Sequence, residues 1–193
     1  ANRVAHLLVK DMGLVPGNRV LLRGPNNPMM AACWFAVMKA GGIAVATMPL
    51  LRAKELTEIV NKAEVTHALC DKRLESELKA AMPACGSLRE VKYWYEDATD
   101  SLIARKPITF ENVDTASDDV ALIAFTSGTT GKPKGTMHFH RDVLAMCDCF
   151  PRSCLEPSAG DVYCGTPPLA FTFGLGGLLC FPMRFGASTV LVE

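Results

Sequence analysis

The chain has 193 residues, of which 49% are hydrophobic and 21% are charged, and its 20 basic side chains balance its 20 acidic ones. This hydrophobic share is enough to bury a sizeable core. The zero net charge and the 7% aromatic content argue against nucleic acid or an anionic membrane surface as a general partner.

Strands and helices are expected to alternate along the first half of the chain. Short apolar runs predict strands at 19–23, 43–47, 66–70 and 88–95, and apolar residues at helical spacing predict helices at 2–9, 28–40, 52–62 and 71–81. Asn26-Asn27-Pro28 offers an N-cap and a first-turn proline to the second of these helices. The alternation predicts an α/β fold with mostly parallel sheet layers, flanking helices and right-handed crossovers.

A polar stretch at 96–117 separates two portions of the chain. It is predicted to be irregular, and its acidic residues suit a solvated linker. We therefore expect a first α/β subdomain portion at 1–117 and a second portion, which carries the chemical motifs, at 118–193. The chain starts inside a predicted helix and ends in a predicted strand, so we expect a piece of a longer protein, truncated at its C-terminal end.

The second portion is expected to contain strands at 120–125 and 188–193 and a helix at 137–150. Residues 162–183 carry no charge, and a stretch of that length could span a bilayer. Its prolines and glycines would interrupt a spanning helix. We therefore predict buried strand, loop and helix there, and no membrane span.

The eight cysteines are scattered through core-like segments, and no signal peptide is visible. They predict reduced, mostly buried thiols in a cytoplasmic protein. A zinc site built from His138, His140, Cys147, Cys149 and Cys154 is disfavoured, because the chain has no Cys-x-x-Cys pair. The two histidines are interpreted as helix-start residues that hold the preceding loop, not as catalytic bases.

The most informative stretch is Thr-Ser-Gly-Thr-Thr-Gly-Lys-Pro-Lys-Gly at 126–135, which follows an apolar run. Glycines bring backbone N–H groups close to a ligand, hydroxyls donate hydrogen bonds and lysines supply charge, so the stretch predicts a polyphosphate cradle. A P-loop does not fit, because Ala124 replaces its first glycine and Pro133 replaces its hydroxyl residue. An ordinary surface loop between strand and helix is the simplest alternative.

In its full order, this stretch resembles the signature loop of the adenylate-forming, AMP-binding superfamily. That superfamily contains acyl- and aryl-CoA synthetases, peptide-synthetase adenylation domains and firefly-type luciferases. Residues 135–142, which follow, are also similar to the CoA ligases. The resemblance implies a Mg²⁺ contact at Thr126. It implies ATP-phosphate contacts from Thr126, Ser127, Gly128, Thr129, Thr130, Gly131, Lys132 and Lys134.

A second stretch, at 167–177, resembles the segment that lines the carboxylate pocket of the family. Phe171 stands where many fatty-acyl and coumarate-type members carry His, which makes the chain look closest to benzoate- and 2-aminobenzoate-CoA ligases. The resemblance implies substrate contacts from Phe171, Phe173 and Gly174, with an aromatic wall against a substrate ring. The competing interpretation is that both phenylalanines are core aromatics on a buried strand.

The function that the resemblance implies is ATP-dependent carboxylate–CoA ligation. The carboxylate first forms an acyl-adenylate, and CoA then forms the thioester. ATP, Mg²⁺, CoA and a small, aromatic carboxylate are the implied ligands, with no nucleic acid among them. The family's later motifs, including its distal lysine, do not occur here, so no catalytic residue is assigned and these residues alone are expected to be inactive.

Two alternatives to an acid–thiol ligase stay open. A peptide-synthetase adenylation domain would need an Asp in the substrate pocket to hold an amino group, and residues 167–177 contain none. A non-catalytic nucleotide-binding module that retains the loop belongs to another class. The oligomeric state is not determined by the sequence, and a homodimer is one alternative.

Overall fold

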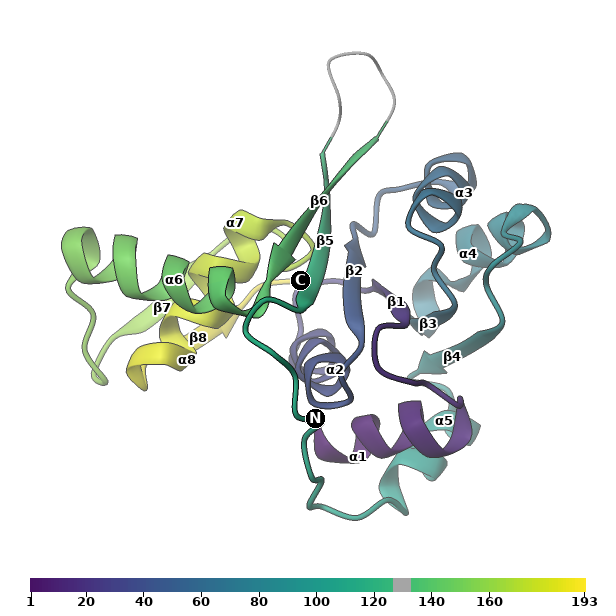
Figure 1. The fold of residues 1–193 in the computed structure, drawn as a ribbon, viewed down its shortest axis with the longest axis horizontal. Helices are drawn as coiled ribbons and strands as arrows, with labels where there is room; N and C mark the ends of the chain where they lie inside the picture. The colour runs from purple at the N-terminus through teal and green to yellow at the C-terminus, as the bar shows by residue number, and fades with distance from the viewer. Residues whose placement is uncertain (127–132) are drawn as a thin grey trace.

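The computed structural model describes residues 1–126 and 133–193. Its centre is a six-stranded sheet of order β4-β3-β1-β2-β5-β6 (Figure 1). Its strands are β1 (Arg19–Arg23), β2 (Ile43–Thr47), β3 (His67–Asp71), β4 (Glu90–Trp94), β5 (Val120–Thr126) and β6 (Lys134–Phe139). The first five are parallel, and β6 runs antiparallel to β5. The predicted α/β class with a mainly parallel sheet is confirmed.

Helices cover both faces of this sheet. They are α1 (Asn2–His6), which continues as the π-helix η1 (Leu7–Asp11), α2 (Pro28–Lys39), α3 (Ala53–Lys62), α4 (Glu75–Ala81) and α5 (Asp97–Ala104). Short 3₁₀ turns, η2 (Lys72–Leu74) and η3 (Met82–Ala84), flank α4. In β1, Val20 and Leu22 join the core cluster of α1 and α2, whereas Leu21 joins the cluster of α3 and α4. Strands buried on both faces are typical of parallel sheets.

The predicted start of α2 is confirmed at atomic level. The Met30 N–H donates to the Asn27 Oδ1 at 2.9 Å, and Pro28 occupies the first turn, where its missing N–H costs nothing. Gly41 follows the helix with a φ of +71°, a conformation that favours glycine. The turn therefore leads directly into β2.

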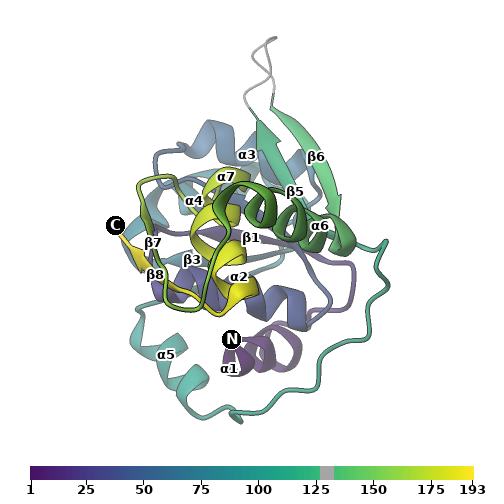
Figure 2. The ribbon, with the colours of Figure 1, turned by 90° about the vertical axis from the view of Figure 1, so that its left-hand side faces the viewer.

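The last part of the chain packs beside the end of the sheet that carries β5 and β6 (Figure 2). It contains α6 (His140–Phe150), η4 (Pro151–Leu155), β7 (Val162–Gly165), α7 (Thr172–Leu175), η5 (Gly176–Cys180), α8 (Phe181–Phe185) and β8 (Ser188–Leu191). Strands β7 and β8 pair in parallel as a second, two-stranded sheet. Over the described residues, no helix combines the length and the apolar character needed to cross a membrane.

Two sequence predictions are wrong. The helix expected from Met137 starts at His140, because residues 134–139 form β6 and pair with β5 from Thr126–Lys134 to Val120–Phe139. The stretch expected to be irregular contains α5, which is held by tertiary packing: Thr99 is buried, and Leu102 and Ile103 pack against the core. The proposed division between residues 117 and 118 stays a prediction. Strand β5, which follows this point, belongs to the same sheet as β1.

Candidate functional site

The carboxyl ends of the parallel strands meet at one edge of the sheet, where α/β proteins place their ligands. At this edge a cavity of about 370 Å³ opens between α3 and the β5–β6 hairpin. Thr47 and Met48 line it from the end of β2, Ile59 from α3, and Phe125 from β5. The cavity therefore combines an apolar wall with an edge that polar side chains can reach.

The base of the β5–β6 hairpin borders this cavity. Thr126, the last residue of β5, and Pro133 both line it. Thr126 and Lys134 are directly opposite each other on the two strands, and both are exposed. The other predicted phosphate contacts lie outside the described residues: Ser127, Gly128, Thr129, Thr130, Gly131 and Lys132. The structure thus brings a hydroxyl and a cation of the predicted set side by side.

The predicted substrate residues lie around the start of α7. Phe171 is the N-cap residue, is 43% exposed and lines the cavity. Phe173 is 77% exposed and does not line it. The interpretation of the two as core aromatics on a buried strand is therefore wrong. Gly174 is buried, and a Cβ there would lie 2.1 Å from the Pro168 carbonyl oxygen, so this close turn requires glycine.

Helix α3 adds three charged side chains to the cavity wall that the sequence reasoning missed, Lys54, Glu55 and Glu58. Glu55 also accepts a hydrogen bond from the Arg52 N–H at 3.1 Å and so caps the helix. The sequence did carry a signal for these side chains, because a helix that follows a parallel strand starts at the carboxyl edge of the sheet. The cavity is thus apolar on one side and charged on another.

The loop between β2 and α3 is held from inside the protein by Arg23. This side chain is 1% exposed and stands at the end of β1. Its guanidinium donates to the carbonyl oxygens of Met48 at 2.8 Å, Pro49 at 3.0 Å and Leu51 at 2.9 Å. Because burial disfavours the charged form, the pKa of Arg23 is lowered. Arg23 fixes two of the residues that line the cavity, Met48 and Leu51.

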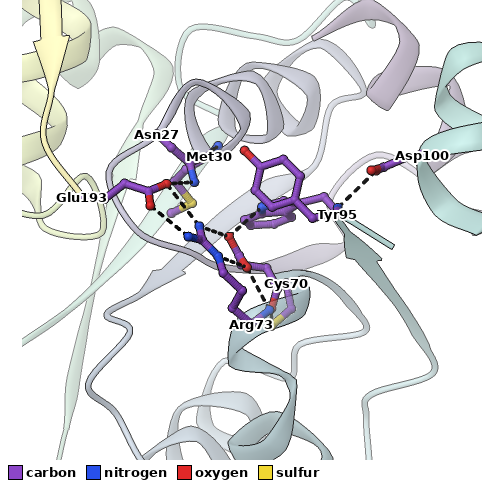
Figure 3. Close-up of polar contacts among 9 residues, drawn as sticks. Asn27, Met30, Cys70, Arg73, Tyr95, Asp100 and Glu193 are labelled. Carbon is purple, nitrogen blue, oxygen red and sulfur yellow. Dashed lines mark hydrogen bonds and ion pairs between the residues drawn. The ribbon is translucent and has the colours of Figure 1, made fainter. Parts of the chain in front are cut away.

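A second polar cluster occupies the same edge of the sheet between β1 and β3, where the strand order reverses. Asp71 is fully buried and accepts hydrogen bonds from Arg73 Nη2 at 2.8 Å and from Trp94 Nε1 at 3.2 Å. Arg73 also reaches Glu193, which accepts from Asn27 at 2.8 Å (Figure 3). Burial raises the pKa of Asp71, but the Arg73 donors outweigh burial and leave the pKa lowered. We call these five residues the Asp71 cluster.

No group of three His, Cys, Asp or Glu side chains suited to a metal ion occurs within residues 1–126 and 133–193. All eight cysteines are free thiols, and those of α2, β3 and η5 are buried. His138 lines a smaller cavity of about 140 Å³ together with Asp142 and Val143 of α6. The metal contact expected at Thr126 stays a prediction.

The chain matches the family of AMP-binding enzymes over residues 1–193. It is 28% identical over 197 residues to the benzoate–CoA ligase of Thauera aromatica, covering 99% of this chain and 37% of that protein. It is 29% identical over 182 residues to the anthranilate–CoA ligase of Pseudomonas aeruginosa, covering 92% and 35%. The chain therefore spans little more than a third of the length of these relatives.

The fold agrees with these matches. The structure of the anthranilate CoA ligase AuaEII in complex with anthranoyl-AMP superposes with a TM-score of 0.93 at 26% identity, over 99% of this chain and 37% of that one. A benzoate CoA ligase from Burkholderia xenovorans, at 22% identity, shares the fold with a TM-score of 0.87 over 98% of this chain and 38% of that one. The chain belongs to the AMP-binding enzyme family.

Proposed function

We propose that this chain provides the phosphate-loop region of an ATP-dependent CoA ligase for aromatic carboxylates. One observation carries the proposal: Thr126 lines the same cavity as Phe171, and Lys134 stands opposite Thr126 on the neighbouring strand. Family membership and the activities of the relatives, which are CoA ligases for benzoate and anthranilate, support it. The proposal concerns the whole protein in which this chain works.

In the proposed first step, a carboxylate oxygen attacks the α-phosphorus of ATP and pyrophosphate leaves. In the second, the thiol sulfur of CoA attacks the acyl carbon and AMP leaves. Phosphoryl transfer depends mainly on positioning and on neutralised charge. Lys134 supplies a cation on a long stem, and the exposed Thr126 hydroxyl is a hard oxygen ligand that suits Mg²⁺, which would neutralise phosphate charge when bound.

The aromatic specificity is proposed from the start of α7. Phe171 presents a partly exposed ring at the cavity wall, which favours offset or edge-on contact with a substrate ring, whereas Phe173 is an exposed neighbour outside that wall. Gly174 brings the backbone close to Pro168 and so fixes the turn that carries both rings. An aliphatic acid would gain less from these contacts than benzoate or 2-aminobenzoate does. A cytoplasmic location is proposed on the eight free thiols.

The test is ATP–pyrophosphate exchange by the full-length protein that carries this chain, with benzoate, 2-aminobenzoate, hexanoate and phenylalanine as acids. We expect exchange with the two benzoates, followed by thioester formation when CoA is added. Exchange with phenylalanine alone would instead support a peptide-synthetase adenylation domain. ATP binding without exchange would support a non-catalytic nucleotide-binding module, and either result would overturn the proposal.

A further inference from the structure

The β5–β6 hairpin extends past the rest of its sheet (Figure 1). Strand β2 is in register with β5 at one pair, Ala44 with Leu122, whereas β5 and β6 stay paired as far as Thr126 and Lys134. Strand β2 ends at Thr47, so within the described part of the chain the pair Thr126 and Lys134 lies past the end of β2. Support from another neighbouring element is therefore needed at this end of the hairpin.

Helix α3 provides that support. The hairpin side chains Ile123 and Phe125 pack against the core cluster of α3 and α4. At the end of α3, Lys62 Nζ donates a hydrogen bond to the carbonyl oxygen of Pro133 at 2.9 Å. This bond joins residues 71 positions apart and reaches the hairpin just before β6 begins.

Lys62 is well placed to hold that carbonyl. It is the last residue of α3, where the helix dipole stabilises a cation. The same helix is anchored by Leu56, Ile59 and Val60, all of them buried. Among the described residues Lys62 forms no ion pair, so the Pro133 carbonyl is its polar partner there.

We propose that Lys62 is a positioning residue for the phosphate-binding hairpin. By holding the Pro133 carbonyl, it fixes the direction of the backbone at the next residue, Lys134, which pairs with Thr126. The inference rests on the proposed function for its kinetic consequence, because phosphoryl transfer is sensitive to the placement of charge. An exposed hydrogen bond contributes little to global stability, so placement and stability are separable.

The first test compares Lys62→Met, which keeps the stem but removes the donor, with Lys62→Arg, which keeps a donor. Lys10→Met is the matched control, since Lys10 is exposed in η1 and forms no hydrogen bond or ion pair within the described part. In the full-length protein we expect Lys62→Met to raise the KM for ATP about tenfold at an unchanged Tm. Lys62→Arg and Lys10→Met should leave the KM for ATP near the wild-type value.

The second test needs no enzymatic activity. Trypsin cleaves after Lys134, and its cleavage rate reports how often the hairpin base opens. We expect the fragment that starts at Gly135 to appear about five- to tenfold faster in Lys62→Met than in wild type, Lys62→Arg or Lys10→Met.

The two tests separate failure of the inference from failure of the proposed function. Equal cleavage rates and an equal KM for ATP in Lys62→Met and wild type would overturn the inference. A lowered Tm in Lys62→Met would also overturn it, because Lys62 would then be a general structural residue. If the wild-type protein activates no carboxylate, the proposed function fails, and faster cleavage of Lys62→Met still supports the positioning role.

Discussion

Two stretches of the same sheet edge differ in how their polar groups are used. Between β1 and β3, the Asp71 cluster pairs its charges internally, and a Cβ on Gly24 would lie 2.4 Å from the Trp94 ring. Between α3 and the hairpin, Thr126 and Lys134 are exposed beside a cavity of about 370 Å³. The reversal of strand order alone would direct attention to the first stretch. Its unfilled space and its exposed polar groups favour the second stretch as the ligand-binding one.

The first stretch is therefore interpreted as structural. Glu193 follows β8, and its contacts with Arg73 and Asn27 connect the two-stranded sheet to the central one. The following predictions test whether substitutions in the two stretches have separable effects, in order of decreasing size.

The largest effect is expected at Arg23, which lies between the two stretches. Arg23→Met should lower the free energy of unfolding by about 3–5 kcal/mol, because it removes a buried guanidinium and leaves the partly buried carbonyl groups of Met48, Pro49 and Leu51 without donors. Urea denaturation measures the loss, and Arg23→Lys, which retains some donors, should lose less. A change below about 1 kcal/mol would show that the loop satisfies its carbonyls in another way.

The next effect is expected at Lys134. Lys134→Ala should slow benzoate-dependent ATP–pyrophosphate exchange about 100-fold, since it removes a cation placed to neutralise phosphate charge. Its exposed position predicts almost no change in Tm. Asp71→Asn is the comparison from the closed stretch and should lower Tm while exchange per folded molecule is retained. The reverse pattern would place the functional stretch at β1 and β3.

A smaller effect is expected at Phe171. Phe171→Ala should raise the KM for benzoate about tenfold through loss of the ring contact, with the KM for ATP unchanged. Tyr95→Ala removes another half-exposed ring, 49% accessible, beside the Asp71 cluster and should change neither constant. Steady-state kinetics at saturating cosubstrate distinguish the two variants. An equal effect of both would mean that Phe171 does not contact the substrate.

The smallest effect concerns pH. Hydrogen bonds from Arg73 and then from Asn27 lower the pKa of Glu193 to about 2 from an ordinary value of 4.5. A carboxylate with a lowered pKa stabilises the fold above pH 4.5, and this contribution is lost as the pH falls toward 2. The difference in Tm between wild type and Arg73→Met should therefore be smaller at pH 3 than at pH 7. A difference in Tm that is equal at pH 3 and pH 7 would mean that the ionised form of Glu193 contributes nothing to stability through Arg73.

Most of the central sheet could be predicted because its strands are buried on both faces and are bounded by turn residues. The strand at β2 is predicted residue for residue, at Ile43–Thr47. Strand β6 was missed because its hairpin pairing with β5 is a tertiary property, while residues after Met137 already carry a helical period. Helix α5 was missed because its first turn is polar, and packing by Leu102 and Ile103, not propensity, stabilises it.

The family could be predicted where the order of residues in one segment defines the chemistry, as in the motif at 126–135. The ligand contacts assigned to that motif and to Phe171 and Phe173 stay predictions, and of the two rings Phe171 alone lines the cavity. The order of strands and helices could have placed the start of α3, with Lys54, at this edge, but the contact of Lys62 depends on how that helix packs beside the hairpin, and no local pattern encodes it. The buried donors of Arg23 were missed for the same reason, since a charged residue at the end of a strand does not show which loop it holds.

The most direct test of the central proposal follows oxygen atoms. The full-length protein would be given benzoate labelled with ¹⁸O in its carboxylate, together with ATP, Mg²⁺ and CoA, and the products would be analysed by mass spectrometry. If the carboxylate attacks the α-phosphorus and CoA then displaces AMP, one ¹⁸O atom is transferred to AMP and none to pyrophosphate. Label in inorganic phosphate, or thioester formation without labelled AMP, would contradict the adenylate-forming account.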